Sequence, residues 1–548
     1  MTTNKILIIG LDGGTFDLAR PWAEQGYLPH IKSLLERGVS CDLHSTLPPV
    51  TSPAWPSFMT GMNPGKHGVF DFIRPKGVGY DIVNATLIKQ PTIWERLAHA
   101  GVRVGVVNVP VTYPPRPLSG GFMITGLLSP RNATISYPPD LIRRYESRLG
   151  PYHVTPSVQY KYGDEDAFIA DIKHVIRTRG RYARALLENE PWDVMMTVYG
   201  STDIASHALW RFMDETHPQH DPSAPEHLKN ALRDIYALVD EQIGGMLEVV
   251  PPGTAVILMS DHGFGPLHYT VNLNLLLLQT GLMHLKNTPP TRFKAFLFHN
   301  GISPKTVYQQ LEKIGLYHLA ARVSRRQRNA IVGKFLSYDD VDWARTKAYS
   351  MGHVGQIYIN TKGRHPFGSV EPGPEEEAVR WEVIQALDTL RHPVTGQPIV
   401  DRVVRREEIF SGPYALYGPD LQVILDGYRC ISFPLFATTP QLFTEQIRGD
   451  SGCHRREGMF LAAGPGIVQG IRSEPASILD LAPTIMYLLG LPVPPEMDGK
   501  PLTDILAQPH EPVYAEAGAP YAVDPETGLT PEQTVEIEER LRGLGYLE

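Results

Sequence analysis

At 548 residues the chain is too long for one compact core of ordinary size, so one large domain with insertions, or two to three domains, is expected. Charged residues make up 20% of the chain and the formal net charge is −8, which argues against a nucleic-acid polymer as the main partner. The three cysteines do not form a disulfide framework and suit a reducing compartment. The sequence shows no secretory signal and no apolar run of membrane-spanning length, so a cytoplasmic protein is expected.

Short apolar runs with the length of buried parallel strands recur along the chain, and segments with helical spacing of apolar residues separate them. This alternation predicts an α/β fold around a mostly parallel sheet. The clearest predicted strands are 5–12, 103–110, 193–203 and 254–263, and the predicted helices lie within 28–38, 90–101 and 228–250.

The character of the sequence changes after residue 284. Residues 285–350 have a helical and basic pattern and are interpreted as an inserted helical cap, whose basic run at 322–328 reads as a solvated helix face. The alternative for this run is contact with an anionic substrate or a membrane surface. The strand-like segments 355–364 and 419–427 are expected to resume the main sheet. The predicted division is therefore a catalytic core in two parts, a cap and a tail with a short helix: 1–284, 285–350, 351–505 and 506–548.

Three of the predicted strands end in aspartate, namely Asp12, Asp203 and Asp261. Ligands of open α/β sheets gather beyond the carboxyl ends of the strands, where converging carboxylates repel one another unless cations or protons intervene. A single aspartate there would be read as a cap or turn former. Two of the three aspartates have a histidine close by in the sequence: His207 lies four residues after Asp203, and His262 directly follows Asp261. Mixed carboxylate and imidazole ligands suit zinc, manganese or iron better than calcium, so we expect a metal site.

Two adjacent hydroxyl residues, Thr51 and Ser52, stand before Pro53 at the start of an expected helix. Proline fits the first helical position, so Ser52 is predicted to be the N-cap and Thr51 to precede it. Free N–H groups at this helix start would favour a phosphate, and a coordinated hydroxyl would be activated as a nucleophile. The alternative is a capping pair with no catalytic role.

Seven segments carry a resemblance to a known family, in the expected order from residue 5 to about residue 503. The chain resembles the alkaline phosphatase superfamily, in particular its type I phosphodiesterase/nucleotide pyrophosphatase branch. The segments are IIGLDGGTFD, TSPAWPSFMTGMNPGKHGV, PTIWERLAHAGVRVGVVNVPVTYPP, YGSTDIASHALW, MSDHGFG, GCHRREGMFLAAGPGI and ILDLAPTIMYLLGLPVPPEMDGKPL.

The resemblance implies a three-layer αβα sandwich with an inserted cap, and two bound divalent metal ions, zinc first and manganese second. It assigns one metal to Asp12, Asp261, His262 and Thr51, and the other to Asp203, His207 and His454. His454 comes from the resemblance alone, since no spacing in the sequence points to it. The implied function is hydrolysis of a small-molecule phosphate ester, most simply a phosphodiester or pyrophosphate, through a phospho-threonine intermediate.

The family places its nucleophile two residues before a proline, which selects Thr51 and leaves Ser52 as the runner-up. Threonine followed by Ala54 and Trp55 argues against a sulfatase. These two residues also depart from the Thr-x-Pro-Asn-His pattern of the nucleotide pyrophosphatases. Asn108 is a candidate to replace the missing asparagine as a substrate ligand, with a packing or turn role as the alternative, and Ser52 is a second candidate substrate ligand. The alternatives are a phosphomonoesterase or phosphomutase of the same superfamily, and a non-catalytic phosphate- or lipid-binding module.

Overall fold

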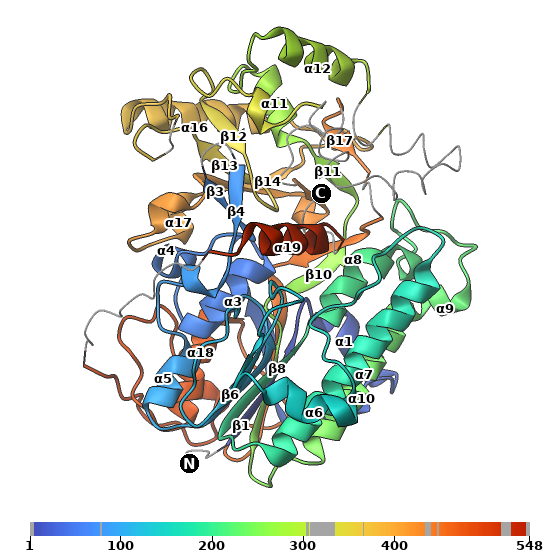
Figure 1. The fold of residues 1–548 in the computed structure, drawn as a ribbon, viewed down its shortest axis with the longest axis vertical. Helices are drawn as coiled ribbons and strands as arrows, with labels where there is room; N and C mark the ends of the chain where they lie inside the picture. Colours follow the sequence, from blue (N-terminus) through green and yellow to red (C-terminus); the bar gives the residue numbers. More distant parts are fainter. Residues whose placement is uncertain are drawn as a thin grey trace.

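The computed structural model describes residues 5–76, 79–302, 306, 335–364, 367–432, 440–445, 449–516 and 528–543 (Figure 1). Its main element is a ten-stranded sheet, in which β21 (Ala476–Ser477) pairs with β2 beside the other nine strands. Across the sheet these nine are β20 (Ile471–Arg472), β2 (Gly38–His44), β19 (Glu457–Ala463), β9 (Ala255–Met259), β1 (Ile6–Leu11), β8 (Val194–Tyr199), β5 (Val104–Val109), β6 (Phe122–Thr125) and β7 (Ser136–Tyr137).

The central strands β9, β1, β8 and β5 run parallel to one another, and every residue in them is buried. Ile6 of β1 stands opposite Val194 on one side and Ala255 on the other, which places the carboxyl ends of the three strands at one edge of the sheet. Strands covered on both faces read as continuous apolar runs, which is why the sequence reveals them. The predicted α/β fold with a mostly parallel sheet is confirmed.

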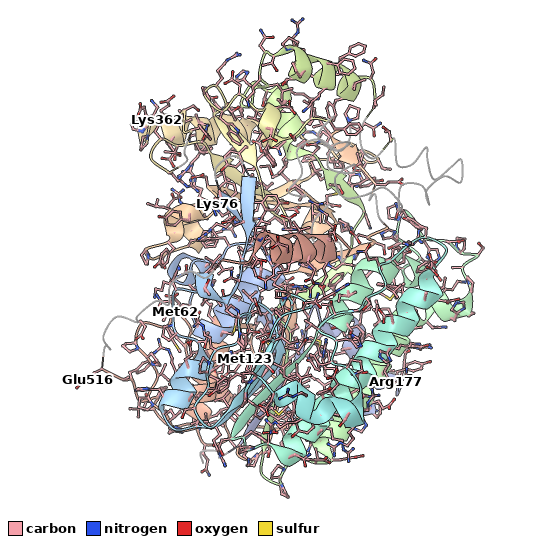
Figure 2. All side chains as sticks on the ribbon, in the orientation of Figure 1. Met62, Lys76, Met123, Arg177, Lys362 and Glu516 are labelled. Carbon is pink, nitrogen blue, oxygen red and sulfur yellow. The ribbon has the colours of Figure 1, made fainter. Side chains whose placement is uncertain are left out.

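Helices cover both faces of this sheet, as Figure 1 shows, and side chains fill the space between the layers (Figure 2). One layer packs around the long helices α7 and α10, and the other around α3. The first layer holds α1 (Phe16–Glu24), α2 (Pro29–Arg37), α6 (Leu141–Leu149), α7 (Glu165–Asn189), α8 (Ser201–Met213), α9 (Glu226–Lys229) and α10 (Ala231–Leu247), and the second holds α3 (Thr51–Thr60), α5 (Ile93–His99) and α18 (Leu481–Leu488).

A glycine in β1 allows α3 to approach the sheet closely. A Cβ atom at Gly10 would lie 2.8 Å from the ring of Trp55 and 2.8 Å from a methyl group of Val198. The absence of a side chain at this position lets the fully buried Trp55 lie directly against the strand. The start of α3 is thereby held at the carboxyl edge of the sheet.

A second, seven-stranded sheet lies above the first one in Figure 1. The segments 355–364 and 419–427 do contain strands, β13 and β15, but both pair in this second sheet, so the expectation that they resume the main sheet is wrong. The second sheet comprises β11 (Tyr269–Val271), β12 (Ala348–Ser350), β13 (Gln356–Ile359), β14 (Val400–Arg405), β15 (Leu421–Leu425), β16 (Cys430–Ile431) and β17 (Phe443–Thr444), and its helices are α11 (Leu273–Gln279), α12 (Pro289–His299), α16 (Pro374–Leu387) and α17 (Arg406–Ile409).

The predicted cap at 285–350 contributes α12 and β12, whereas the basic run 322–328 lies outside the described residues. The predicted terminal helix is α19 (Pro531–Gly543), and it docks through Arg540, which donates to the carbonyl oxygen of Ser129 at 2.6 Å. Among the described residues, no helix is long and apolar enough to cross a membrane. The remaining elements are α4 (Pro64–His67) and two two-stranded ribbons, β3 (Ile73–Lys76) with β4 (Gly79–Ile82) and β10 (Gly263–Pro266) with β18 (Gly452–Arg455).

Candidate active site

The three predicted aspartates meet at the carboxyl edge of the main sheet, each in the segment that follows one of three neighbouring strands, β1, β8 and β9. Asp12 follows β1 directly, and Asp261 follows β9 in the turn that leads into β10. Asp203 does not end a strand as expected, because β8 stops at Tyr199 and Asp203 lies in the first turn of α8. All three carboxylates are at most 2% exposed.

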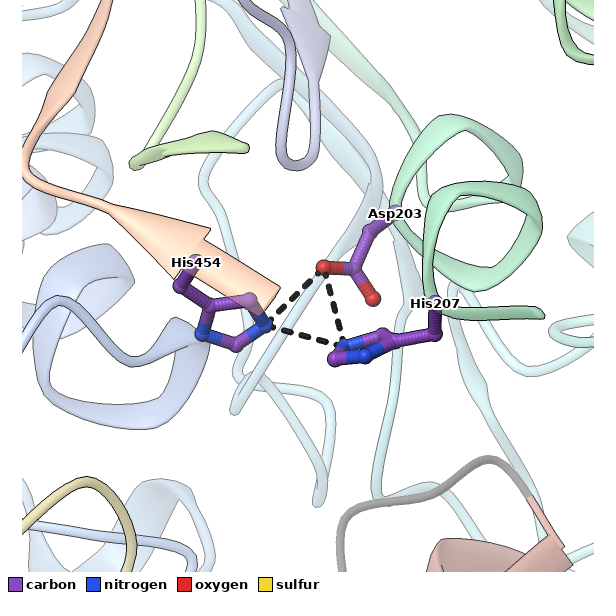
Figure 3. A group of neighbouring side chains, drawn as sticks. All are labelled: Asp203, His207 and His454. Atoms are coloured by element: carbon purple, nitrogen blue, oxygen red, sulfur yellow. Dashed lines mark hydrogen bonds and ion pairs between the residues drawn. The ribbon is translucent and has the colours of Figure 1, made fainter. Parts of the chain in front are cut away.

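One group of side chains combines Asp203 with two histidines, His207 and His454 (Figure 3). His207 lies one turn further along α8, so it shares a helix face with Asp203, as the four-residue spacing predicts. His454 comes from β18, whose pairing with β10 sets it opposite Phe264. The Asp203 Oδ1 atom lies 3.1 Å from His454 Nε2 and 3.6 Å from His207 Nε2, and the two Nε2 atoms are 3.0 Å apart.

A second group lies beside the first one and shares Asp203 with it. His262 Nε2 is 3.7 Å from Asp12 Oδ1, 3.3 Å from Asp261 Oδ2 and 3.9 Å from Asp203 Oδ1. The ring of His262 also stacks on that of His454, with centroids 3.7 Å apart. Six side chains from four separate parts of the chain therefore form one continuous cluster.

The backbone fixes the tautomer of all three imidazoles. The Nδ1 atoms of His207, His262 and His454 face the carbonyl oxygens of Gly452 at 3.0 Å, Gly263 at 3.1 Å and Pro49 at 2.8 Å. A carbonyl oxygen only accepts hydrogen bonds, so each Nδ1 carries a proton, and Nε2 is the ring atom that each histidine offers to the cluster. This is the orientation of histidines that bind metal ions.

The charges in the cluster are unbalanced. Burial, together with repulsion from neighbouring carboxylates, raises the pKa of Asp12 and of Asp261. Burial also opposes ionisation of Asp203, but the imidazoles that face it, His207 first, lower the pKa of this carboxyl overall. Burial lowers the pKa of His454 to about 3 and thus keeps the ring neutral. Since Oδ2 of Asp261 also accepts no hydrogen bond, the residues present fit divalent cations as the groups that complete the site.

Thr51 places a hydroxyl group at the second group of ligands. Its Oγ1 atom lies 3.2 Å from His262 Nε2 and 3.4 Å from Asp12 Oδ1, to which it donates. The capping prediction is wrong: α3 begins at Thr51 with Val50 as its N-cap, and no side chain caps it. Pro53 is thus the third helical residue, where its missing N–H still costs no helical hydrogen bond. Ser52 is fully buried, and its hydroxyl group has no hydrogen-bond partner.

Asn108 lies beside the cluster, and its side chain is hydrogen-bonded to other residues. Asn108 lies near the carboxyl end of β5 and has φ of 62°, a left-handed conformation that asparagine tolerates better than most residues. Its Nδ2 atom donates to the carbonyl oxygen of Val198 at 3.1 Å, and its Oδ1 atom accepts from the Tyr152 hydroxyl at 3.4 Å. The side chain lines a cavity that Asp12 also lines.

Two supporting residues were not expected from the sequence. The indole Nε1 of Trp55 donates to Asp12 Oδ2 at 3.1 Å, and the backbone N–H of Gly13 donates to Asp261 Oδ1 at 3.1 Å. The position of Trp55 four residues after Thr51 is a usable signal, since both side chains then share one face of α3. Gly13 has φ of 65°, and a Cβ atom there would lie 2.8 Å from Phe264 and 3.1 Å from Asp203 Oδ1, so only glycine fits this turn.

Carboxylates and imidazoles grouped around a buried hydroxyl at such a sheet edge are typical of enzymes that hydrolyse phosphoric esters with the help of metal ions. The sequence places the chain in this class. Residues 6–416 match the family described as type I phosphodiesterase / nucleotide pyrophosphatase, and the chain belongs to this family. The predicted resemblance and the prediction of a phosphoric ester hydrolase are confirmed.

The fold is shared with a solved hydrolase at low sequence identity. Phosphonoacetate hydrolase from Sinorhizobium meliloti 1021, in complex with phosphonoacetate, superposes with a TM-score of 0.51 at 14% identity, covering 89% of this chain and 96% of that one. Human ectonucleotide pyrophosphatase/phosphodiesterase 5, and the inactive murine protein in complex with AMP, each give a TM-score of 0.48 at 15% identity, covering 92% of this chain and 100% of theirs. No curated protein matches the chain in sequence.

Proposed function

We propose that the protein is a two-metal phosphodiesterase that acts on a small-molecule substrate through a covalent intermediate on Thr51. The observation that carries the proposal is the position of Thr51 Oγ1, a fully buried hydroxyl within 3.4 Å of Asp12 and His262 at the edge of the six-residue cluster. A capping role alone would not require the hydroxyl group of Thr51 to face Asp12 and His262.

Two sets of residues would hold the cations. Asp203, His207 and His454 form one set, and Asp12, Asp261, His262 and Thr51 form the other. Zinc is the first choice and manganese the second, because both accept mixed carboxylate and imidazole ligands. When bound, such ions neutralise charge on the phosphoryl oxygens and lower the pKa of a hydroxyl group or water.

The residues of the chain account for the remaining requirements of the reaction. Asp12 accepts the hydrogen bond of Thr51, which directs an oxygen lone pair toward the substrate, and Trp55 holds Asp12 in place. In the proposed reaction Thr51 Oγ1 attacks phosphorus, the P–O bond to one alcohol breaks, and that alcohol leaves with a proton. Water then breaks the bond between Thr51 and phosphorus, and this second step restores the hydroxyl group.

The test compares Thr51→Ala with Ser52→Ala, using bis(p-nitrophenyl) phosphate as a diester and p-nitrophenyl phosphate as a monoester. We expect Thr51→Ala to lose at least a thousandfold in kcat while its zinc content, measured by elemental analysis, stays close to that of the parent. Ser52→Ala should keep most of the activity. Equal loss in both variants would contradict the assignment of the nucleophile, and preference for the monoester would favour a phosphomonoesterase.

A further inference from the structure

A cavity of about 20 Å³ opens beside the metal-ligand cluster, between the ends of β5 and β8 and the helix α7. Asp12 forms part of its wall and also belongs to the metal-ligand cluster, so the cavity and the proposed reaction site share a residue. A cavity needs about 10–15 Å³ by the same measure to hold one water molecule, so this one admits a small polar group. The polar residues in its wall include Asn108, Arg179 and Ser201.

The notable member of this wall is Arg179, a guanidinium group that is only 2% exposed. It reaches from α7 to the end of β8, where Nη1 donates to the carbonyl oxygen of Val198 at 3.2 Å. Nη2 donates to the carbonyl oxygen of Val154 at 2.7 Å. Nη2 also donates to the carbonyl oxygen of His153 at 3.4 Å. In the described part of the chain no carboxylate forms an ion pair with Arg179, and its Nε–H has no hydrogen-bond partner. A buried arginine is ordinarily paired with an anion.

Other groups in the same wall also favour an anion. The cavity meets the N-terminus of α8 at Gly200 and Ser201, where the helix has no side-chain cap and its first N–H groups are directed out of the helix. Ser201 is 1% exposed, and its hydroxyl group has no hydrogen-bond partner among the residues that the structure describes. Asn108 Nδ2 and Arg179 Nη1 share one acceptor, the carbonyl oxygen of Val198, so their two donor groups lie side by side.

The negative charge of Asp12 does not cancel the preference of the cavity for an anion. Its Oδ2 atom accepts from Trp55, and its Oδ1 atom faces Thr51 and His262, so both oxygens are engaged on the metal-ligand side. The positive charge of Arg179 therefore remains for a group in the cavity.

We infer that this cavity is a substrate subsite for a carboxylate carried on one arm of the phosphodiester, with Arg179 as its specificity-determining residue. The inference rests on the proposed function and narrows its substrate class to phosphodiesters with a second negative charge. A neutral arm of the same length would leave the guanidinium group buried without its counter-ion. The enzyme should therefore prefer a phosphodiester with a carboxylate arm over one with a neutral arm of the same length.

The experiment uses two substrates that differ only in the terminal group of one arm, a carboxylate in p-nitrophenyl 3-carboxypropyl phosphate and a methyl group in p-nitrophenyl butyl phosphate. Both release p-nitrophenol. The parent should hydrolyse the carboxylate ester with a roughly ten- to hundredfold higher kcat/KM, mainly through a lower KM, since charge-assisted hydrogen bonds are the strong ones. Arg179→Met should remove this preference, so that kcat/KM falls much more for the carboxylate ester than for the butyl ester.

Arg177→Met is the matched control, because this arginine lies on the same helix but is exposed (Figure 2). It should retain the preference, and Arg179→Lys should retain part of it. If Arg179 serves only to clamp the backbone, Arg179→Met will lower kcat/KM for both esters equally, and this result would overturn the inference. So would a parent enzyme that hydrolyses both esters equally well.

A binding measurement separates failure of the subsite from failure of the proposed function. Zinc-loaded Thr51→Ala, titrated calorimetrically with both esters, should bind the carboxylate ester at least tenfold more tightly, and Thr51→Ala combined with Arg179→Met should bind the two equally. If the parent hydrolyses neither ester, the proposed function fails, yet this titration still decides whether the cavity selects a carboxylate. Equal binding by Thr51→Ala would reject the subsite.

Discussion

Replacing Trp55 by phenylalanine tests whether the fold prepares Asp12 as a metal ligand. The indole Nε1 donates to Asp12 Oδ2 at 3.1 Å, and this hydrogen bond lowers the otherwise raised pKa of the Asp12 carboxyl. The variant loses one hydrogen bond to a charged group, about 1.5–3 kcal/mol, which corresponds to a loss of roughly ten- to hundredfold in zinc affinity.

Trp94→Phe provides the matched control. Trp94 is also buried and packs against the other side of Phe58: the ring centroids of Trp55 and of Trp94 each lie 5.9 Å from that of Phe58. Its Nε1 atom makes no hydrogen bond among the described residues, so this variant loses packing alone. Both variants should lower the melting temperature through the cavity they create.

The assay is a zinc titration against a competing chelator, with each variant shown to be folded by circular dichroism. We expect weaker zinc binding in Trp55→Phe and parental binding in Trp94→Phe. The weakening should grow as the pH falls, because loss of the indole hydrogen bond raises the pKa of Asp12 and lets protons compete with the metal. Equal zinc affinities for the two variants would refute the reasoning.

Three further predictions concern stability. Burial and repulsion raise the pKa of Asp261, so its charged form destabilises the metal-free protein at pH values above that pKa. Asp261→Asn should therefore raise the melting temperature of the metal-free protein at pH 7, and the gain should shrink toward pH 4. A gain that does not depend on pH would contradict this prediction. Chelation of the metal should lower the parental melting temperature more than that of Asp261→Asn, as calorimetry can show. Asp71 is buried and accepts a hydrogen bond from His353 Nδ1 at 2.6 Å, so Asp71→Ala should lower the free energy of unfolding by about 3 kcal/mol in a denaturant titration. Asp81→Ala is the control and should lower it little, because the Asp81 side chain is 36% exposed. Equal losses in the two variants would argue against a stabilising role of the Asp71–His353 contact.

The parts of the fold that the sequence predicts well are those in which local pattern and tertiary environment agree. The strands at 5–12, 103–110 and 254–263 are buried on both faces, so their apolar runs are unbroken. The strands predicted at 193–203 and 254–263 are both too long. The first stops at Tyr199, because Gly200 and Ser201 start a helix whose early residues, Asp203 included, are buried in the cluster. The second stops at Met259, before the turn that holds Asp261. The segments 355–364 and 419–427 show that a strand pattern reveals a strand and not the sheet to which it belongs.

The same contrast holds for the site. Position after a strand identifies Asp12 and Asp261, and helical spacing links His207 to Asp203. His454 reaches the cluster through the pairing of β18 with β10, almost two hundred residues apart, and no local pattern encodes such a contact. The wrong capping prediction for Ser52 has a related cause: the backbone enters α3 at Val50, and Thr51 points to Asp12 and not back to the helix.

The most direct test of the account traps the covalent intermediate. The zinc-loaded enzyme is mixed with bis(p-nitrophenyl) phosphate, quenched in acid within the first turnover and digested for peptide mass spectrometry. We predict a p-nitrophenyl phosphate adduct on Thr51, in the peptide that begins α3, and none in Thr51→Ala. An adduct on Ser52, or full turnover with no adduct on any residue, would contradict the central claim.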